Sequence, residues 1–143
     1  MAEAVLKSSL AKAPRLPNLL VDSAGTHANG GKPDVRAKTA LQRRNYQPTN
    51  RRARRIRAQD FDKFDLILAM DRANLAYLLD LAPAGTEPKI RLFLDFDSIY
   101  FGQEMPDPYY GGEQGFERVL DLCEAGVAGL IAAIQSGETF TSA

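Results

Sequence analysis

The chain has 143 residues, and its 18 basic and 18 acidic side chains give a formal net charge of zero. This balance excludes a bulk electrostatic attraction to nucleic acid or to a membrane surface. A hydrophobic share of 45% is ordinary for a globular protein, and no apolar run approaches the roughly 20 residues that span a bilayer. The single cysteine, Cys123, rules out an internal disulfide, which suits a reducing compartment. We therefore expect one cytoplasmic domain over residues 1–143.

Helices and strands are expected to alternate along the chain. Four helices are predicted by apolar side chains at three- and four-residue steps, over residues 1–13, 35–45, 72–82 and 113–135. Asp34 and Asp71 precede two of these helices as suitable N-caps. Three short apolar runs predict buried strands, over residues 19–25, 64–70 and 89–96.

Such an alternation predicts an α/β fold, with a three-layer arrangement in which helices cover both faces of a parallel sheet. Ligands of these folds bind beyond the carboxyl ends of the strands. The sequence SAGTH (23–27) follows the first predicted strand, Asp71 follows the second, and a loop with MPDPYYGG (105–112) follows the third. We therefore expect these three segments to meet at one edge of the sheet.

Several stretches of the chain resemble the low-molecular-weight protein tyrosine phosphatases. The matching stretches are VDSAGT (21–26), RRAR (51–54), DFDKFDLILAMDRANL (60–75) and MPDPYYGGEQGFERVLDLCEAG (105–126). The resemblance extends from Met1 to about Ile134, and the aspartate–proline–tyrosine–tyrosine–glycine stretch before the last helix is its most specific part. It implies hydrolysis of phosphotyrosine on proteins through a phosphocysteine, without metal or cofactor.

The family resemblance also implies a first strand and a phosphate loop of the form C-x-x-x-x-x-R-S-P. A helix opening much like MAEAVL follows that loop in the family, so both would lie before Met1. The loop supplies the nucleophilic cysteine and the arginine that grips the phosphate. We therefore expect the chain to be truncated at its N-terminus, as a start assigned to the wrong methionine would make it, and to be inactive as given.

The resemblance assigns roles to four residues of this sequence. Asp107 is the expected general acid, which protonates the tyrosine leaving oxygen and then activates water against the phosphocysteine. Tyr109 and Tyr110 are expected to form two walls of a slot for the phosphotyrosine ring. Ser23 is expected to support the phosphate loop through its hydroxyl, although a bond within its own turn is equally compatible with the sequence.

Three other features are interpreted as structural. Cys123 lies on the apolar stripe of the last helix, so we expect it to pack in the core rather than act as a nucleophile. His27 is expected to be a surface histidine. The stretch from Arg43 to Arg57 holds seven arginines and no acid. It could bind an anionic partner or pair with nearby acids; because Tyr46 is its only aromatic residue, we expect no nucleic-acid partner.

Other functions remain open from the residues alone. A non-catalytic binding domain would fit a genuine loss of the nucleophile, and arginine phosphatases share the SAGT sequence. The two tyrosines favour a flat aromatic substrate over phosphoarginine. Arsenate reduction would require further cysteines near Asp107, and the sequence has none there.

Overall fold

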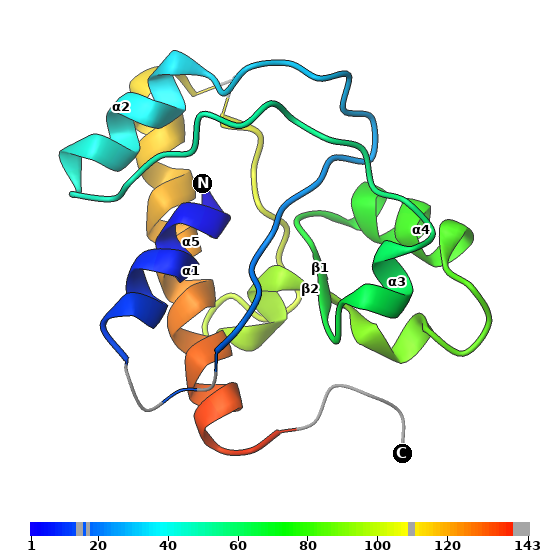
Figure 1. Ribbon diagram of the computed structural model, residues 1–143. Helices are drawn as coiled ribbons and strands as arrows, with labels where there is room; N and C mark the ends of the chain where they lie inside the picture. The colour runs from blue at the N-terminus through cyan, green and yellow to red at the C-terminus, as the bar shows by residue number, and fades with distance from the viewer. Residues whose placement is uncertain (14–15, 17, 109–110, 139–143) are drawn as a thin grey trace.

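The computed structural model describes residues 1–13, 16, 18–108 and 111–138 (Figure 1). Its helices and strands are α1 (Ala2–Ala11), α2 (Val35–Arg43), α3 (Asp60–Lys63), β1 (Ile67–Ala69), α4 (Arg72–Leu81), β2 (Ile90–Leu92) and α5 (Gly112–Gln135), with 3-10 helices η1 (Glu87–Lys89) and η2 (Phe93–Phe96). All four predicted helices are present. The short helix α3 was not predicted.

Two of the helices begin where an aspartate caps them. The carboxylate of Asp34 accepts a hydrogen bond from the Arg36 backbone N–H at 2.7 Å, before α2. Asp71 accepts one from the Asn74 backbone N–H at 2.7 Å, before α4. Each carboxylate satisfies a donor that the first helical turn leaves without a partner, so the predicted starts are confirmed.

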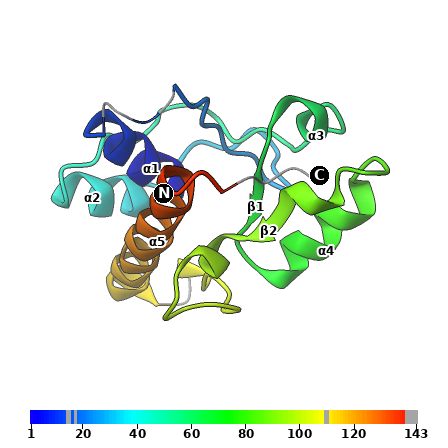
Figure 2. The ribbon, with the colours of Figure 1, turned by 90° about the horizontal axis from the view of Figure 1, so that it is seen from below.

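Helices cover both faces of a parallel pair of strands, as predicted. β1 and β2 pair with Ile67 opposite Ile90 and Ala69 opposite Leu92. Ala69 packs with Leu92 of β2 in an apolar cluster that includes residues of α3 and α4. Leu68, which points to the opposite face, packs against a larger cluster built mainly on α5. Figure 2 shows α1, α2 and α5 on one side of the strands and α3 and α4 on the other.

The predicted strand over residues 19–25 is wrong. Only Gly25 takes part in an isolated parallel bridge, with Arg55, through bonds from Gly25 N–H to the Arg54 carbonyl at 2.8 Å and from Ile56 N–H to the Gly25 carbonyl at 3.0 Å. Residues 19–24 form no backbone–backbone hydrogen bond with any described residue. Leu20 is 67% exposed, so the apolar run is not buried as a central strand would be. An apolar run without a neighbouring strand cannot form a ladder.

The third predicted strand, over residues 89–96, ends early at Leu92. The chain continues as the 3-10 helix η2, whose Phe93 and Leu94 are 2% and 1% exposed. These two side chains belong to the larger cluster, while Leu92 belongs to the smaller one. A continued strand would place consecutive side chains on opposite faces, whereas this turn buries both Phe93 and Leu94 against α5.

The buried stripe of α5 forms most of the larger cluster, as its spacing predicts. Residues at three- and four-residue steps are at most 5% exposed, namely Phe116, Val119, Leu120, Cys123, Val127 and Leu130. Gly126 and Gly129 face η2 in the same helix, and a Cβ atom at Gly129 would lie 1.9 Å from the Phe96 carbonyl oxygen. These glycines therefore allow η2 to approach the helix closely.

Arg44, just after α2, ties that helix to α5. Its guanidinium lies 2.7 Å from Glu117, 2.9 Å from Asp121 and 2.7 Å from Glu124, and these bonds raise its pKa even though burial opposes the charge. The three acids lie on one face of α5, where they would otherwise repel one another. One arginine of the basic stretch is thus neutralised within the fold.

Candidate active site

The loop that leads to Asp107 is fixed at the carboxyl end of β1. The Met105 backbone N–H donates to the Met70 carbonyl at 2.8 Å. The Glu104 carboxylate accepts from the Arg72 backbone N–H at 2.8 Å, and the Arg72 guanidinium donates to the Gly102 carbonyl at 2.8 Å. These three bonds join the loop to the turn between β1 and α4.

Asp107 follows this anchored loop by two residues, and its side chain is exposed to solvent. Pro106 and Pro108 flank it and restrict the backbone on either side. An exposed carboxyl group on a restrained backbone can reach a bound substrate, which is the arrangement that a general acid needs. Tyr109 and Tyr110, the predicted walls of the slot, lie outside the described residues.

The SAGTH segment reaches the same edge of the fold. The Asn74 side-chain amide donates to the Thr26 hydroxyl at 3.4 Å, and the ring of His27 lies 5.3 Å from the ring of Tyr77. Asn74 and Tyr77 belong to α4, which starts where β1 ends. The predicted meeting of the SAGTH segment, Asp71 and the loop with Asp107 is thereby supported by contacts that converge on the start of α4.

Ser23, the first residue of the SAGTH segment, contacts the first turn of α1. Its hydroxyl donates to Glu3 Oε2 at 2.6 Å rather than to its own turn. No contact among the described residues joins Ser23 to the loop with Asp107. The bond to Glu3 holds the SAGTH segment against the N-terminal end of α1.

Glu3 is a buried carboxylate that sequence reasoning missed. The residue is 8% exposed, and besides Ser23 it binds Lys7 at 2.7 Å and the guanidinium of Arg51. The spacing of Glu3 and Lys7 by four residues is a helical signal that could have been read in the sequence. The bonds to Ser23 and Arg51 could not, because their partners are 20 and 48 residues away.

A chain of ion pairs continues from Glu3 to α3. Arg51 lies 3.4 Å from Asp22, and Arg54 lies 3.2 Å from Asp22 and 3.0 Å from Asp60. Asp60 is 2% exposed and also accepts from the Arg57 backbone N–H at 2.8 Å. The network therefore joins α1, the segment before SAGTH, the arginine-rich segment and α3.

The pKa values of the three acids in this network are lowered. Burial alone would raise the pKa of Glu3, but hydrogen bonds from Lys7 and Ser23 and the charges of Lys7 and Arg51 outweigh burial. Burial also raises the pKa of Asp22, but the hydrogen bond from the Ser23 N–H and the charges of Arg54 and Arg51 lower it by more. The same balance lowers the pKa of Asp60, through Arg54 and the Arg57 N–H. A group whose pKa falls on folding stabilises the fold above its unfolded pKa.

Stability is therefore expected to fall as the pH drops through and below the ordinary values of 4.5 for Glu3 and 3.8 for Asp60. Urea unfolding followed at pH 7 and pH 3 measures this, and Asp60→Asn should reduce the difference between the two pH values. Asp62→Asn, which removes an exposed carboxylate of the same helix, is the matched control and should leave the difference unchanged. Equal effects of the two substitutions would contradict the role of the network.

Cys123 is in the core, as predicted. It is 1% exposed, and burial raises the pKa of its thiol to about 11. A nucleophilic cysteine requires a thiolate and access to substrate, and Cys123 has neither. His27 is exposed, as predicted for a surface histidine.

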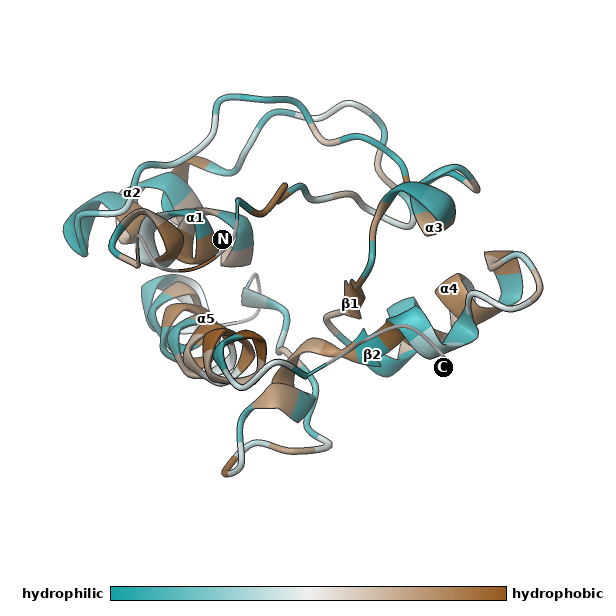
Figure 3. Ribbon diagram, turned by 60° about the horizontal axis from the view of Figure 1, so that its bottom comes forward, coloured by the Kyte–Doolittle hydropathy of each residue, from teal (hydrophilic) through white to brown (hydrophobic). Residues whose placement is uncertain are grey.

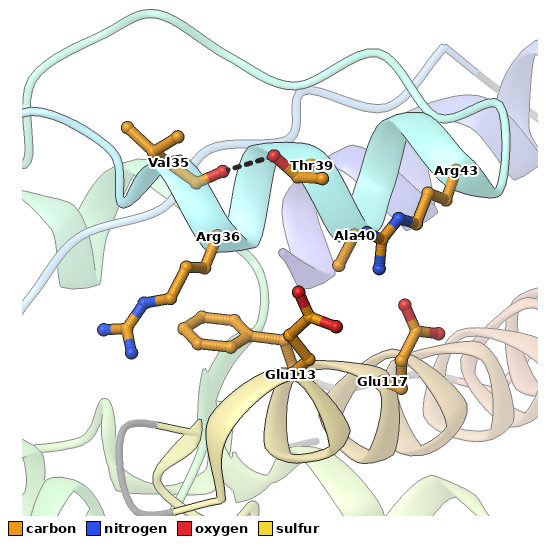
Figure 4. A pocket seen from close by; sticks show the side chains of 8 residues that line it. Val35, Arg36, Thr39, Ala40, Arg43, Glu113 and Glu117 are labelled. Atoms are coloured by element: carbon orange, nitrogen blue, oxygen red, sulfur yellow. Dashed lines mark hydrogen bonds between the residues drawn. The ribbon is translucent and has the colours of Figure 1, made fainter.

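A shallow groove lies between α2 and the first turns of α5 (Figure 4). Arg43, Glu113 and Glu117 point into the space between the two helices, and the Arg36 guanidinium lies 5.0 Å from the centre of the Phe116 ring. Both charge signs line this groove, and none of the predicted site residues does.

Within the described part of the chain, no helix is both long and apolar enough to cross a membrane.

Comparison with known proteins identifies the family to which this chain belongs. Residues 1–139 match the model of the low molecular weight phosphotyrosine protein phosphatases. A low molecular weight protein-tyrosine-phosphatase of Streptomyces coelicolor is 36% identical over 94% of this chain and 85% of its own length. A low molecular weight phosphotyrosine protein phosphatase of Schizosaccharomyces pombe is 38% identical over 81% of this chain and 76% of its own length.

The solved structures agree with the sequence relatives. A protein tyrosine phosphatase from Entamoeba histolytica superposes with a TM-score of 0.88 at 38% identity, over 95% of this chain and 88% of the other. The chain belongs to the low molecular weight phosphotyrosine protein phosphatase family. Its family is a family of hydrolases that act on phosphoproteins, as the resemblance in the sequence predicts.

Proposed function

We propose that the edge formed by the SAGTH segment, the start of α4 and the loop with Asp107 is the active-site edge of a single phosphatase domain over residues 1–143. The observation that carries this proposal is the convergence of the first and third segments on the turn after β1 and the start of α4, through Thr26–Asn74, Met105–Met70 and Glu104–Arg72. In α/β folds this edge is where substrates bind. Membership of the low molecular weight phosphotyrosine protein phosphatase family supports phosphotyrosine hydrolysis as the reaction at this edge.

In the proposed reaction a cysteine thiolate attacks the phosphorus of phosphotyrosine, and the bond from phosphorus to the tyrosine oxygen breaks. Asp107 gives its proton to that oxygen, then takes a proton from the water that hydrolyses the phosphocysteine. Tyr109 and Tyr110 hold the aromatic ring of the substrate between them. Ser23 supports the phosphate loop from the side of α1.

The nucleophile of this reaction is not among the 143 residues, because the single cysteine is Cys123 and its thiol is buried. We propose that this chain by itself does not turn over phosphotyrosine. A protein with the same residues preceded by a strand and a C-x-x-x-x-x-R-S-P loop would supply the thiolate and the phosphate-binding donors.

A pair of proteins tests this assignment. The 143-residue chain is compared with the same chain extended before Met1 by a strand and a C-x-x-x-x-x-R-S-P loop. We expect hydrolysis of a phosphotyrosine peptide by the extended protein and background rates with the 143-residue chain. A folded extended protein that hydrolyses no phosphotyrosine, or a shorter chain that equals it, would contradict the proposal.

The substrate is proposed to be a phosphotyrosine protein of the cytoplasm, and neither nucleic acid nor a membrane is part of the proposal. The zero net charge gives the whole molecule no attraction for polyanionic surfaces. Comparing phosphotyrosine, phosphoserine and phosphoarginine peptides with the extended protein measures the preference directly. We expect the phosphotyrosine peptide to be hydrolysed fastest.

A further inference from the structure

The fold neutralises only part of its arginine-rich stretch. Of the seven arginines from Arg43 to Arg57, Arg44, Arg51 and Arg54 form ion pairs with acids. Within the described part of the chain, no acidic side chain lies within ion-pairing distance of the other four, which are Arg43, Arg52, Arg55 and Arg57. Positive charge that a fold leaves uncompensated is available to an anionic partner.

Three of these four arginines, Arg52, Arg55 and Arg57, lie on one segment, in which exposure alternates from Arg54 to Arg57. Arg54 and Ile56 are half-buried, and Ile56 packs against the smaller apolar cluster. Arg55 and Arg57, which alternate with them, are exposed, and so is Arg52. The inward side chains therefore anchor the segment, while Arg55 and Arg57 point to the opposite side. We call Arg52, Arg55 and Arg57 the arginine row.

The segment that carries the arginine row is hydrogen-bonded to the proposed active-site segment SAGTH and to the loop that follows it. Arg55 forms the bridge with Gly25, the Ala53 N–H donates to the Gly31 carbonyl at 2.8 Å, and the Arg52 guanidinium donates to the Gly30 carbonyl at 3.0 Å. Figure 1 shows the two segments running side by side over the top of the molecule, and Figure 3 shows both as mainly hydrophilic. A peptide bound at the site would thus have the arginine row beside it.

We infer that the arginine row is a docking face for acidic residues that flank the phosphotyrosine of a protein substrate. This inference rests on the proposed function and names the kind of sequence that the site takes. Residues two apart in an extended chain are about 6.6 Å apart, so Arg55 and Arg57 match carboxylates at alternate positions of an extended peptide. Each guanidinium can bind a carboxylate through two parallel hydrogen bonds.

The alternative occupant, a nucleic acid, fits these residues less well. Base stacking needs aromatic side chains between the cations, and residues 51–57 contain none. The row is also short and belongs to a chain with no net charge. A peptide with two or three acidic residues matches its length and its charge.

A set of four peptides tests the inference on the 143-residue chain. The peptides carry phosphotyrosine or tyrosine, each with glutamates or with glutamines at the alternate flanking positions. The measured quantity is the ratio of Kd between the glutamine and glutamate forms, by fluorescence anisotropy at low salt. We expect the glutamate form to bind about tenfold more tightly, with the ratio falling as salt is added.

Two matched variants locate the effect. Arg55→Gln with Arg57→Gln removes two charges from the row and should bring the ratio to about twofold or less. Lys12→Gln with Arg118→Gln removes two exposed charges from α5 and the end of α1 and should leave the ratio unchanged. A ratio of one in the unaltered protein, or an equal loss in both variants, would overturn the inference.

The remaining outcomes separate this inference from the proposed function. If the phosphorylated and unphosphorylated glutamate peptides bind equally well to the extended protein described above, the proposal of a phosphotyrosine substrate fails. The Kd ratio between the glutamine and glutamate peptides still tests whether the arginine row binds acidic residues. If phosphate strengthens binding but the flanking glutamates do not, the inference that the arginine row binds acidic residues is overturned and the proposed function stands. A single-stranded oligonucleotide that displaces the glutamate peptide at lower concentration than unlabelled peptide would assign the row to nucleic acid instead.

Discussion

Replacing Asp107 with asparagine is expected to lower kcat for a phosphotyrosine peptide by about 10²- to 10⁴-fold in the protein extended by the phosphate loop. Asparagine keeps the shape of the side chain and loses the transferable proton. The tyrosine oxygen would then leave as an anion, and no group would activate water in the second step. The three bonds that anchor the loop from Gly102 to Met105 are made by Met70, Arg72, Gly102, Glu104 and Met105, so the substitution leaves their donors and acceptors in place.

The leaving group distinguishes this role from a structural one. An aryl phosphate whose phenol is acidic needs little help from a general acid, so the loss should be smaller for para-nitrophenyl phosphate than for the peptide. Glu104→Gln, which changes the same charge three residues earlier, is the matched control and should alter kcat by less than about threefold, since glutamine can still accept from the Arg72 N–H. Equal losses for both substrates would argue against proton transfer by Asp107.

Replacing Gly129 with alanine is expected to destabilise the fold by about 3 kcal/mol. Alanine is favoured over glycine by about 1 kcal/mol inside a helix, so local propensity alone predicts the opposite sign. The new Cβ atom would lie 1.9 Å from the Phe96 carbonyl oxygen, and a backbone group cannot rotate away. Separation of α5 from η2 would relieve the overlap, at the expense of the packing of Phe93 and Leu94.

Urea unfolding measures this difference, with two comparisons. Gly126→Ala places its Cβ 2.5 Å from the Phe93 ring, which can shift, so we expect a smaller loss of about 1–2 kcal/mol. Ala132→Gly on the exposed side of α5 should cost about 1 kcal/mol through helix propensity alone. An unchanged or higher stability of Gly129→Ala would show that α5 and η2 are not in the contact described.

The sequence predicts most elements of this fold because their signals are local. A capping aspartate and a repeating apolar stripe specify α4 and α5 without reference to the rest of the chain. The wrong strand over residues 19–25 shows the limit of such signals. A strand exists only through a partner, and apolarity does not reveal whether a partner is adjacent.

The candidate site divides in the same way. The loop with Asp107 reaches the start of α4 as the rule that parallel strands end at one edge predicts. Thr26 reaches the same place through its bond with Asn74, although residues 19–24 form no strand. The bonds of Glu3 to Ser23 and Arg51 link residues that are far apart in sequence, and no periodicity announces them. The same holds for the three arginines that the fold neutralises, which the sequence does not separate from the rest of the run.

The two apolar clusters also differ in how much the burial of apolar side chains stabilises each of them. The smaller one is built on five buried residues, Phe61, Ala69, Leu78, Ile90 and Leu92, and the larger one on more than twice as many. Local opening of a protein begins where the least apolar surface must be exposed. The start of α4 lies on the side of the sheet that holds the smaller cluster. Thr26 and Glu104 are both hydrogen-bonded to it. Transient opening of the protein would thus dismantle the proposed active-site edge before it disturbs the helical half around α5.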